Sequence, residues 1–229
     1  MSTQSSAARG IAELLEALVC AATTELHLRG AVVTVTSAHD SEGIVASSDP
    51  GSRALAEVEF SIGEGPAHDA FAYGRPVLVP DLDGSQGDVW PGYAPAALAA
   101  GIGAVFAFPL QVGASRFGVF SIFHDVPRLL DEEEVAQCLA LSELATELLL
   151  DSSAATGDGE IDPDLKSAFG LRSEIYQAQG MVMVTLGVPL SGALALMRAH
   201  AFAEGRRLID VAIDIVEGRL DLTDREGGQ

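Results

Sequence analysis

The chain has 229 residues, of which 48% are hydrophobic, and its formal net charge is −20 at pH 7. This share of apolar residues is large enough to bury a substantial core, so the composition excludes an intrinsically disordered chain. No stretch approaches the ~18 uninterrupted apolar residues of a membrane span, and the N-terminus lacks a basic segment, so we expect a cytoplasmic protein with neither a span nor a signal peptide.

The acidic charge is unevenly distributed. Residues 1–150 carry six basic and 20 acidic side chains, whereas residues 161–229 carry seven basic and ten acidic ones. Contacts with phosphate need Lys and Arg, so the net charge disfavours binding of nucleic acid by the chain as a whole. A local group of arginines still acts at contact distance, within a Debye length of ~8–10 Å. The C-terminal part therefore remains a candidate for nucleic-acid binding.

Residues 1–150 predict an α+β or α/β domain with a central antiparallel sheet and flanking helices. Apolar residues recur every three or four positions at 11–27, as in an amphipathic helix, and later apolar runs alternate with turn residues, as in short strands. We expect a helix at 11–27, strands at 30–37 and 42–48, a short helix at 66–73, a strand at 76–79, a loop at 81–93, a short alanine-rich helix, strands at 104–113 and 116–125, and a helix at 131–150. The last two strands are apolar enough to lie in the centre of the sheet.

Two local motifs refine this prediction. Asp131 is followed three residues later by Glu134, which predicts a capping box at the start of the last helix. The stretch GEGP at Gly63–Pro66 has two interpretations: its backbone N–H groups cradle an anion at a helix start, or it is a tight turn that needs glycine. We favour the turn.

The predicted loop Asp81–Tyr93 is the candidate ligand-binding segment of this domain. It is rich in Asp, Gly and Pro, and long loops in compact domains often carry binding residues. Its candidate residues are Asp81, Asp83, Trp90 and Tyr93. Spaced acids in a loop are usually solvated, so we expect no metal site there.

Residues 151–164 are small, polar and acidic, which predicts a flexible linker. Residues 165–222 then show helical periodicity throughout and predict a small all-α domain of three helices. Gly187 and Gly205 are expected to end the first two helices, and Pro189 suits the first turn of the second. Residues 223–229 are expected to form a disordered tail.

Motifs of catalysis are missing from the sequence. It contains no nucleophile elbow, Walker loop or dinucleotide fingerprint, and its five histidines are scattered, so we expect neither an enzyme nor a metal or cofactor site. Cys20 and Cys138 lie in helical segments, where we expect both thiols to be core residues.

Two parts of the chain resemble known families. Residues 30–150 resemble a GAF domain through the stretches SIGEGPAHDAFAYGRPVLVPDL, WPGYAPAALAAGIGAVFAFPL and FGVFSIF. Residues 166–220 resemble an ANTAR domain, a three-helix RNA-binding antitermination module, through IYQAQGMVMVTLGV, ALALMRAHA and RRLIDVA. The pair is similar to bacterial regulators in which a sensory domain controls transcription antitermination.

This resemblance implies that the C-terminal domain binds hairpin loops of leader RNA. Arginines contact phosphate, and an aromatic ring stacks on an unpaired base. In this interpretation Gln179 borders the RNA-facing surface and Gly180 allows a close approach between helices. The expected RNA-binding residues are Gln179, Arg198, His200, Phe202, Arg206 and Arg207.

The resemblance also implies partners. The family works as a dimer, and the helices at 11–27 and 131–150 are the natural dimer surface. A small-molecule ligand or an upstream signalling protein would supply the input, and the sequence identifies neither.

Three positions depart from the family pattern: Gln179 replaces a lysine, Phe202 a basic residue and Gly205 an asparagine. They leave open the alternative of a protein–protein signalling adaptor whose C-terminal domain has lost RNA binding. A DNA-binding helix-turn-helix regulator is a second alternative. Against the second, the last helix carries Asp210, Asp214 and Glu217, which the phosphates of a DNA groove would repel.

Overall fold

A computed structural model describes residues 10–36, 42–84, 87–156, 167, 168, 170 and 172–222 of the chain. The predicted tail at 223–229 and most of the predicted linker lie outside the described residues. Among the described residues no single helix is long and apolar enough to cross a membrane. Only the helices α7 (Ser173–Leu186) and α8 (Leu190–Ala203) taken together, with a bend of 106° between them, reach that length and hydropathy.

The N-terminal part is built on an antiparallel sheet of five strands in the order β2-β1-β5-β4-β3. The long strand β5 is the central strand and the long strand β4 lies next to it, so both lie centrally, as predicted. At Gly118 of β5 a Cβ atom would lie 1.9 Å from the carbonyl oxygen of Thr34, so only glycine allows β1 and β5 to pair here. The strands are β1 (Gly30–Thr36), β2 (Glu42–Ser47), β3 (Val77–Val79), β4 (Ala104–Val112) and β5 (Ser115–His124).

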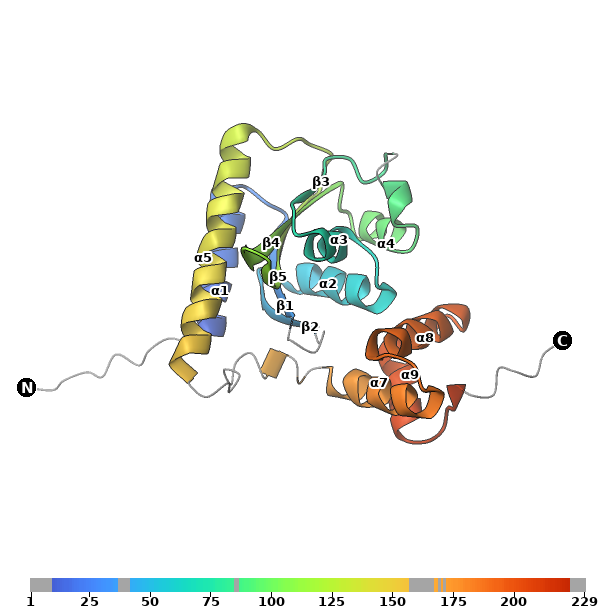
Figure 1. Cartoon of the computed structure of the whole chain (residues 1–229). Coiled ribbons are helices and arrows are strands. Elements are labelled where there is room, and N and C mark those ends of the chain that lie inside the picture. Colours follow the sequence, from blue (N-terminus) through green and yellow to red (C-terminus); the bar gives the residue numbers. More distant parts are fainter. Residues whose placement is uncertain are drawn as a thin grey trace, which may run out of the picture.

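Helices cover both faces of this sheet, as Figure 1 shows. On one face α1 (Ile11–Glu25) and α5 (Glu132–Thr156) pack against each other and against the strands. On the other face lie α2 (Pro50–Ile62), α3 (Pro66–Tyr73) and α4 (Tyr93–Ala99). Because helices cover both faces of the sheet, successive side chains of a strand are buried in opposite cores. Val33 belongs to the core under α1 and α5, and Val32 belongs to the core under α2 and α4.

Helix α2 is the element that the sequence prediction missed. It begins after Asp49, whose Oδ1 accepts hydrogen bonds from the N–H groups of Gly51 at 2.8 Å and Ser52 at 3.1 Å. Pro50 stands in its first turn, and Gly63, with φ of 81°, ends it. Two polar residues, Ser52 and Glu59, lie on its buried face, and they interrupt the apolar pattern that indicates a helix.

Helix α5 begins with the predicted capping box. The N–H of Glu134 donates to Asp131 Oδ1 at 2.9 Å, and the N–H of Asp131 donates to Glu134 Oε2 at 2.9 Å. The helix continues to Thr156, so residues 151–156, predicted as linker, are helical. Cys138 is buried in it, and burial raises the pKa of the thiol to about 12, whereas Cys20 of α1 is exposed, contrary to the prediction.

Within residues 172–222, which the structure describes, the chain forms three helices as predicted: α7 (Ser173–Leu186), α8 (Leu190–Ala203) and α9 (Leu208–Val216). Gly187 and Gly205, with φ of 63° and 61°, stand directly after α7 and shortly after α8. The role predicted for Gly180 is wrong, because a Cβ atom there would meet no atom within 4 Å. The helices bury one common core, to which Ile175, Met197 and Val211 belong.

Candidate functional site

The two parts of the chain are in direct contact, and Phe60 is the residue that joins them. It lies in the last turn of α2, yet its side chain, 3% exposed, belongs to the hydrophobic core of the three C-terminal helices. Figure 1 shows α8 beside α2, and the two helices contact each other. The core of the C-terminal part is therefore completed by a residue of the N-terminal part.

Two arginines and a tyrosine from the C-terminal part surround the Phe60 ring. The guanidinium carbon of Arg172 lies 3.7 Å from the ring centroid, and that of Arg198 lies 5.1 Å from it. The Tyr176 ring meets Phe60 edge-on, with 6.3 Å between centroids and an interplanar angle of 72°. Cations over an aromatic face and edge-to-face rings are both attractive arrangements. We call these four residues the Phe60 clamp.

Hydrogen bonds fix the clamp to the N-terminal part. Arg172, 2% exposed, donates from Nη1 to the carbonyl oxygen of Glu42 at 3.0 Å and from Nε to Glu57 Oε2 at 3.2 Å. The N–H of Glu42 donates to the Tyr176 hydroxyl at 2.7 Å, and that hydroxyl donates to the Glu42 carbonyl. Arg198 Nη2 donates to the carbonyl oxygen of Phe60. Every clamp residue of the C-terminal part thus has a polar contact across the interface.

A cavity of about 260 Å³ lies beside the clamp. The sheet, α2 and α3 of the N-terminal part line it on one side, and α7 and α8 of the C-terminal part line it on the other. Strands β1 and β5 contribute Thr34 and Ser121 to its wall, and α2 and α3 contribute Glu59 and His68. Gln179 of α7 and Arg198 of α8 close it from the other side. The cavity is therefore formed by both parts together. Its apolar wall includes Val32, Phe60, Phe71, Val119 and Leu194.

Burial sets the charges around this cavity. Glu59 accepts hydrogen bonds at Oε1 from the N–H groups of Ala67 at 2.6 Å and His68 at 3.1 Å, yet desolvation raises the pKa of its carboxyl to about 8. Desolvation, assisted by the charge of Arg198, lowers the pKa of His68. Near neutral pH, Glu59 and His68 are therefore both uncharged.

The same hydrogen bonds decide between the two interpretations of Gly63–Pro66. The first N–H groups of α3 bind the Glu59 carboxyl of the chain itself, so they are not free for an external anion. Gly63 and Gly65 have φ of 81° and 150°, which is the conformation of the favoured tight turn.

The six expected RNA-binding residues do not form one surface. Gln179, 4% exposed, donates from Nε2 to the carbonyl oxygen of Leu190 at 2.8 Å and lines the cavity, so it borders no exposed surface in this conformation. Arg198 is held in the Phe60 clamp. His200 is half-buried, and its Nδ1 has no hydrogen-bond partner, whereas Phe202 is 82% exposed.

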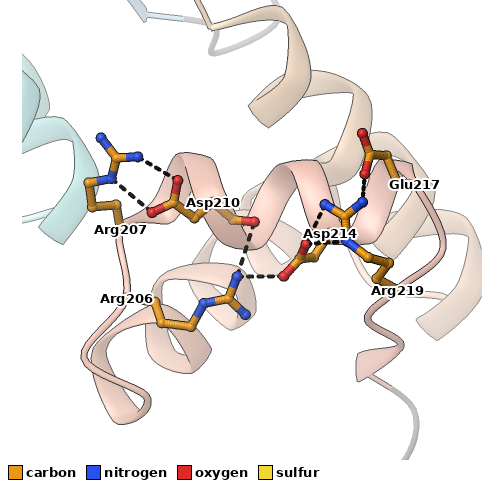
Figure 2. Close-up of polar contacts among 6 residues, drawn as sticks. All are labelled: Arg206, Arg207, Asp210, Asp214, Glu217 and Arg219. Atoms are coloured by element: carbon orange, nitrogen blue, oxygen red, sulfur yellow. Dashed lines mark hydrogen bonds and ion pairs between the residues drawn. The ribbon is translucent and has the colours of Figure 1, made fainter.

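The other two, Arg206 and Arg207, are paired with acids of α9, as Figure 2 shows. Arg207 donates from Nε and Nη2 to the two carboxylate oxygens of Asp210 at 2.8 and 2.6 Å. Arg206 pairs with Asp214, to which Arg219 also donates at 2.7 Å. Hydrogen bonds from these arginines lower the pKa values of Asp210 and Asp214. The acids thus compete with phosphate for the same guanidinium groups.

The four residues of the candidate ligand-binding loop contribute nothing to the wall of the cavity. Trp90 and Tyr93 are 6% and 0% exposed in the core under α2 and α4, where Trp90 Nε1 donates to Asp69 Oδ2 at 3.2 Å. Asp81 and Asp83 are exposed. None of the four lines the cavity, so a ligand site at this loop stays a prediction. Within the described residues, no group of three His, Cys, Asp or Glu side chains is placed to hold a metal ion.

Sequence reasoning missed Phe60, Arg172, Tyr176, Glu42 and Glu57, which make the interface. A prediction of α2 would have placed Phe60 on its apolar face, one position after Glu59. No local pattern marks Arg172 as an interface residue, because an arginine before a helix is usually solvated.

Comparison with known proteins agrees with this division of the chain. The sequence profile of the GAF domain matches residues 8–149, and that of the ANTAR domain matches residues 164–216. No curated protein sequence matches the chain.

Several solved GAF domains are similar to this structure. One, from the phosphoenolpyruvate-protein phosphotransferase of Coxiella burnetii, has a TM-score of 0.54 and 17% identity, over 66% of this chain and 88% of that one. The GAF3 domain of Slr1393 from Synechocystis sp. PCC6803 has a TM-score of 0.53 and 12% identity, over 66% and 100%. The corresponding domain from Acinetobacter has a TM-score of 0.51 and 11% identity, over 67% and 90%. At these identities the likeness shows the fold alone.

Proposed function

Because the chain belongs to the GAF domain family and carries an ANTAR domain after it, we propose that it is a signal-responsive antitermination regulator of bacteria. Its GAF domain senses the signal, and its ANTAR domain binds hairpin loops of leader RNA and prevents transcription termination. The sensor comprises residues 1–150 together with the end of α5 up to Thr156. The linker follows it up to residue 164, and the RNA-binding domain comprises residues 165–222. The protein acts in the cytoplasm by stoichiometric binding and has no catalytic activity.

The observation that supports control by the sensor is the position of Phe60 in the ANTAR core. A change of α2 in the GAF domain moves Phe60 and therefore acts on the packing of the ANTAR helices. Arg198, an expected RNA contact, lies in the same clamp. In the docked conformation its guanidinium binds the Phe60 carbonyl and ring instead of phosphate. Signal and RNA thus act on one equilibrium between a docked and an open ANTAR domain.

The RNA-binding residues then fall into two groups. Phe202 and Arg207 are exposed in the docked conformation and make the first contact, by stacking and by charge, with Arg206 and His200 nearby. Gln179 and Arg198 join them when the domain opens. This order gives a docked protein that binds RNA weakly and an open one that binds it tightly.

The protein is a homodimer, and its dimer surface is formed by α1 and α5. Leu139, Leu144 and Leu150 of α5 are 41%, 46% and 37% exposed. A dimer presents two ANTAR domains, and two RNA hairpins bound together gain affinity from their linkage.

A gel-shift assay with a two-hairpin leader RNA tests the proposal. Removal of two guanidinium groups by Arg198→Ala with Arg207→Ala is expected to abolish binding at unchanged helicity. Binding by the wild type is expected to weaken steeply as salt rises. Arg75→Ala, which removes an exposed arginine of the GAF domain, is the matched control and keeps wild-type affinity. Equal affinity of the double variant and the wild type would contradict the assignment of the RNA-binding residues.

The ion pairs of Arg206 and Arg207 favour a second candidate, a protein–protein adaptor whose ANTAR domain no longer binds RNA. An adaptor shows no binding to the hairpin RNA at any salt concentration. A DNA-binding regulator instead prefers duplex DNA to the hairpin in the same assay.

A further inference from the structure

The cavity between the two domains contains buried hydrogen-bonding atoms that have no partner. Among the described residues, Arg198 Nε and Ser121 Oγ are both buried without a hydrogen bond, and both residues line this cavity. Ser121, on β5, is 2% exposed and belongs to the sensor, whereas Arg198 belongs to the ANTAR domain. Buried polar groups normally have partners, and an unmade hydrogen bond costs free energy. The two atoms indicate a missing acceptor between the domains.

The charges around the cavity indicate that this acceptor is an anion. Within the part of the chain that the structure describes, no carboxylate lies within 4.0 Å of the Arg198 guanidinium. Glu42 also faces the cavity, but its Oε1 lies 3.7 Å from Arg172 Nη1 and its attraction to Arg198 acts over a longer distance. Glu59, the other acid in the wall, is uncharged near neutral pH because of its burial. A buried guanidinium group that has no carboxylate partner in the protein favours the binding of a ligand with a carboxylate group.

The remaining wall determines the size and nature of the anion. The side chains of Val32, Phe71, Val119 and Leu194 give this wall an apolar surface beside the polar atoms. The volume of about 260 Å³ is slightly smaller than that of usual ligand pockets, which run from ~300 to ~1,000 Å³. A molecule that fits has one carboxylate and a compact apolar body.

We propose that this cavity binds a small organic monocarboxylate, which accepts hydrogen bonds from Arg198 and Ser121 and so links the sensor to the ANTAR domain. The ligand contacts both domains only in the docked conformation. It therefore stabilises that conformation and weakens RNA binding by mass action. The inference rests on the proposed function in treating the cavity as the input site of the sensor.

The test compares benzoate with benzamide, which have similar size and differ in charge. Isothermal titration of the full chain is expected to give an affinity for benzoate about tenfold or more above that for benzamide, because a charge-assisted hydrogen bond to Arg198 forms only with the carboxylate. Arg198→Gln is expected to remove this difference, and Ser121→Ala, which leaves the clamp intact, to reduce the benzoate affinity while benzamide changes less. Arg75→Gln is the matched control and keeps the wild-type preference.

Three outcomes overturn the proposal: equal affinity for benzoate and benzamide, an unchanged preference in Arg198→Gln, or no binding of acetate, hexanoate and benzoate at millimolar concentration. Because the titration contains no RNA, it is independent of the proposed function. Benzoate binding without RNA binding leaves the ligand site standing and contradicts the antitermination role. RNA binding without carboxylate binding supports the antitermination role and contradicts the ligand site. If both hold, benzoate is expected to lower the RNA affinity of the wild type and not that of Arg198→Gln.

Discussion

The guanidinium carbon of Arg172 lies 3.7 Å from the centre of the Phe60 ring, and the two residues belong to different domains. The arginine is 2% exposed, which is rare for a charged side chain and requires that its charge be compensated. Glu57 and Glu42 supply this compensation from the sensor side, at 3.1 and 3.7 Å. The contact therefore combines an ion pair with a cation over an aromatic face, and it makes the docked conformation specific.

Truncation of Phe60 is expected to open the molecule. Phe60→Ala removes a buried ring from the ANTAR core and weakens docking by about 3 kcal/mol, the usual cost of such a truncation. Small-angle X-ray scattering is expected to give a larger radius of gyration, and the gel-shift assay a higher RNA affinity. Phe117→Ala, a truncation on β5 beside the core under α1 and α5, is the matched control and leaves both unchanged. Identical scattering of Phe60→Ala and wild type would show that the ring does not hold the domains together.

Stability is expected to fall with rising pH because of Glu59. Its folded pKa of about 8 lies above the value of 4.5 that applies to an unperturbed glutamate, so the folded state binds an extra proton between these values. The contribution is complete below pH 4.5 and is lost as the pH rises through 8, by about 3–5 kcal/mol in total. Urea unfolding from pH 4.5 to 8.5 measures it.

The variant Glu59→Gln keeps the hydrogen-bond acceptor for Ala67 and His68 and removes the titrating proton. Its unfolding free energy is expected to lack the decline and to exceed that of the wild type above pH 8. The exposed Glu143→Gln is the control and keeps the wild-type profile. Parallel profiles for Glu59→Gln and wild type would rule out a protonated Glu59.

Loss of one acid on α9 is expected to strengthen RNA binding. Asp210→Asn removes the negative charge and one of the two oxygens that accept hydrogen bonds from Arg207, and the lost charge no longer repels phosphate. The affinity for hairpin RNA rises several-fold, and the dependence on salt becomes steeper. The same substitution in an Arg207→Ala background is the control, and its gain is expected to be smaller because only the loss of repulsion remains. An equal gain in both backgrounds would mean that Arg207 does not contact RNA.

Helix α2 is expected to depend on its N-cap. Partial burial raises the pKa of Asp49, but hydrogen bonds from Ser52, Ser48 and Gly51 outweigh this effect and hold the pKa below its usual value. Asp49→Ala removes these bonds and lowers the free energy of unfolding by about 1 kcal/mol. Because α2 carries Phe60, the variant is also expected to bind RNA more tightly. Asp49→Asn keeps a capping oxygen and retains most of the stability; equal urea midpoints for Asp49→Ala and wild type would contradict the prediction.

The sequence predicted most elements because their signals are local. The periodicity of α7, α8 and α9, the glycines after them and the pair Asp131 and Glu134 each depend on neighbours within a few residues. The prediction missed α2 although Asp49, Pro50 and Gly63 mark its ends. Glu59 lies on the buried face of this helix, but a glutamate in a sequence is normally expected at an exposed position. That carboxyl is buried because the N–H groups of α3 bind it, which is a property of the turn between the two helices.

The site was less predictable because its residues depend on contacts between distant parts of the chain. An apolar position such as Phe60 indicates burial without saying in which core. The arginines of the ANTAR domain were identified as one group, but Arg198 faces the sensor while Arg206 and Arg207 face acids on α9. Which partner a guanidinium selects follows from the docking of the domains, and no spacing in the sequence encodes it.

The aromatic ring of Phe60 belongs to one domain and packs in the core of the next, and this limits how freely the two domains can be combined with others. If the three C-terminal helices were grafted onto an unrelated sensor, they would lack the side chain that fills their centre, and the vacancy would loosen them. A working chimera needs a bulky ring supplied at the end of a helix at this place. Functional recombinants of such regulators should therefore inherit α2 and the three C-terminal helices from the same parent. Recombinants that take them from different parents should be lost.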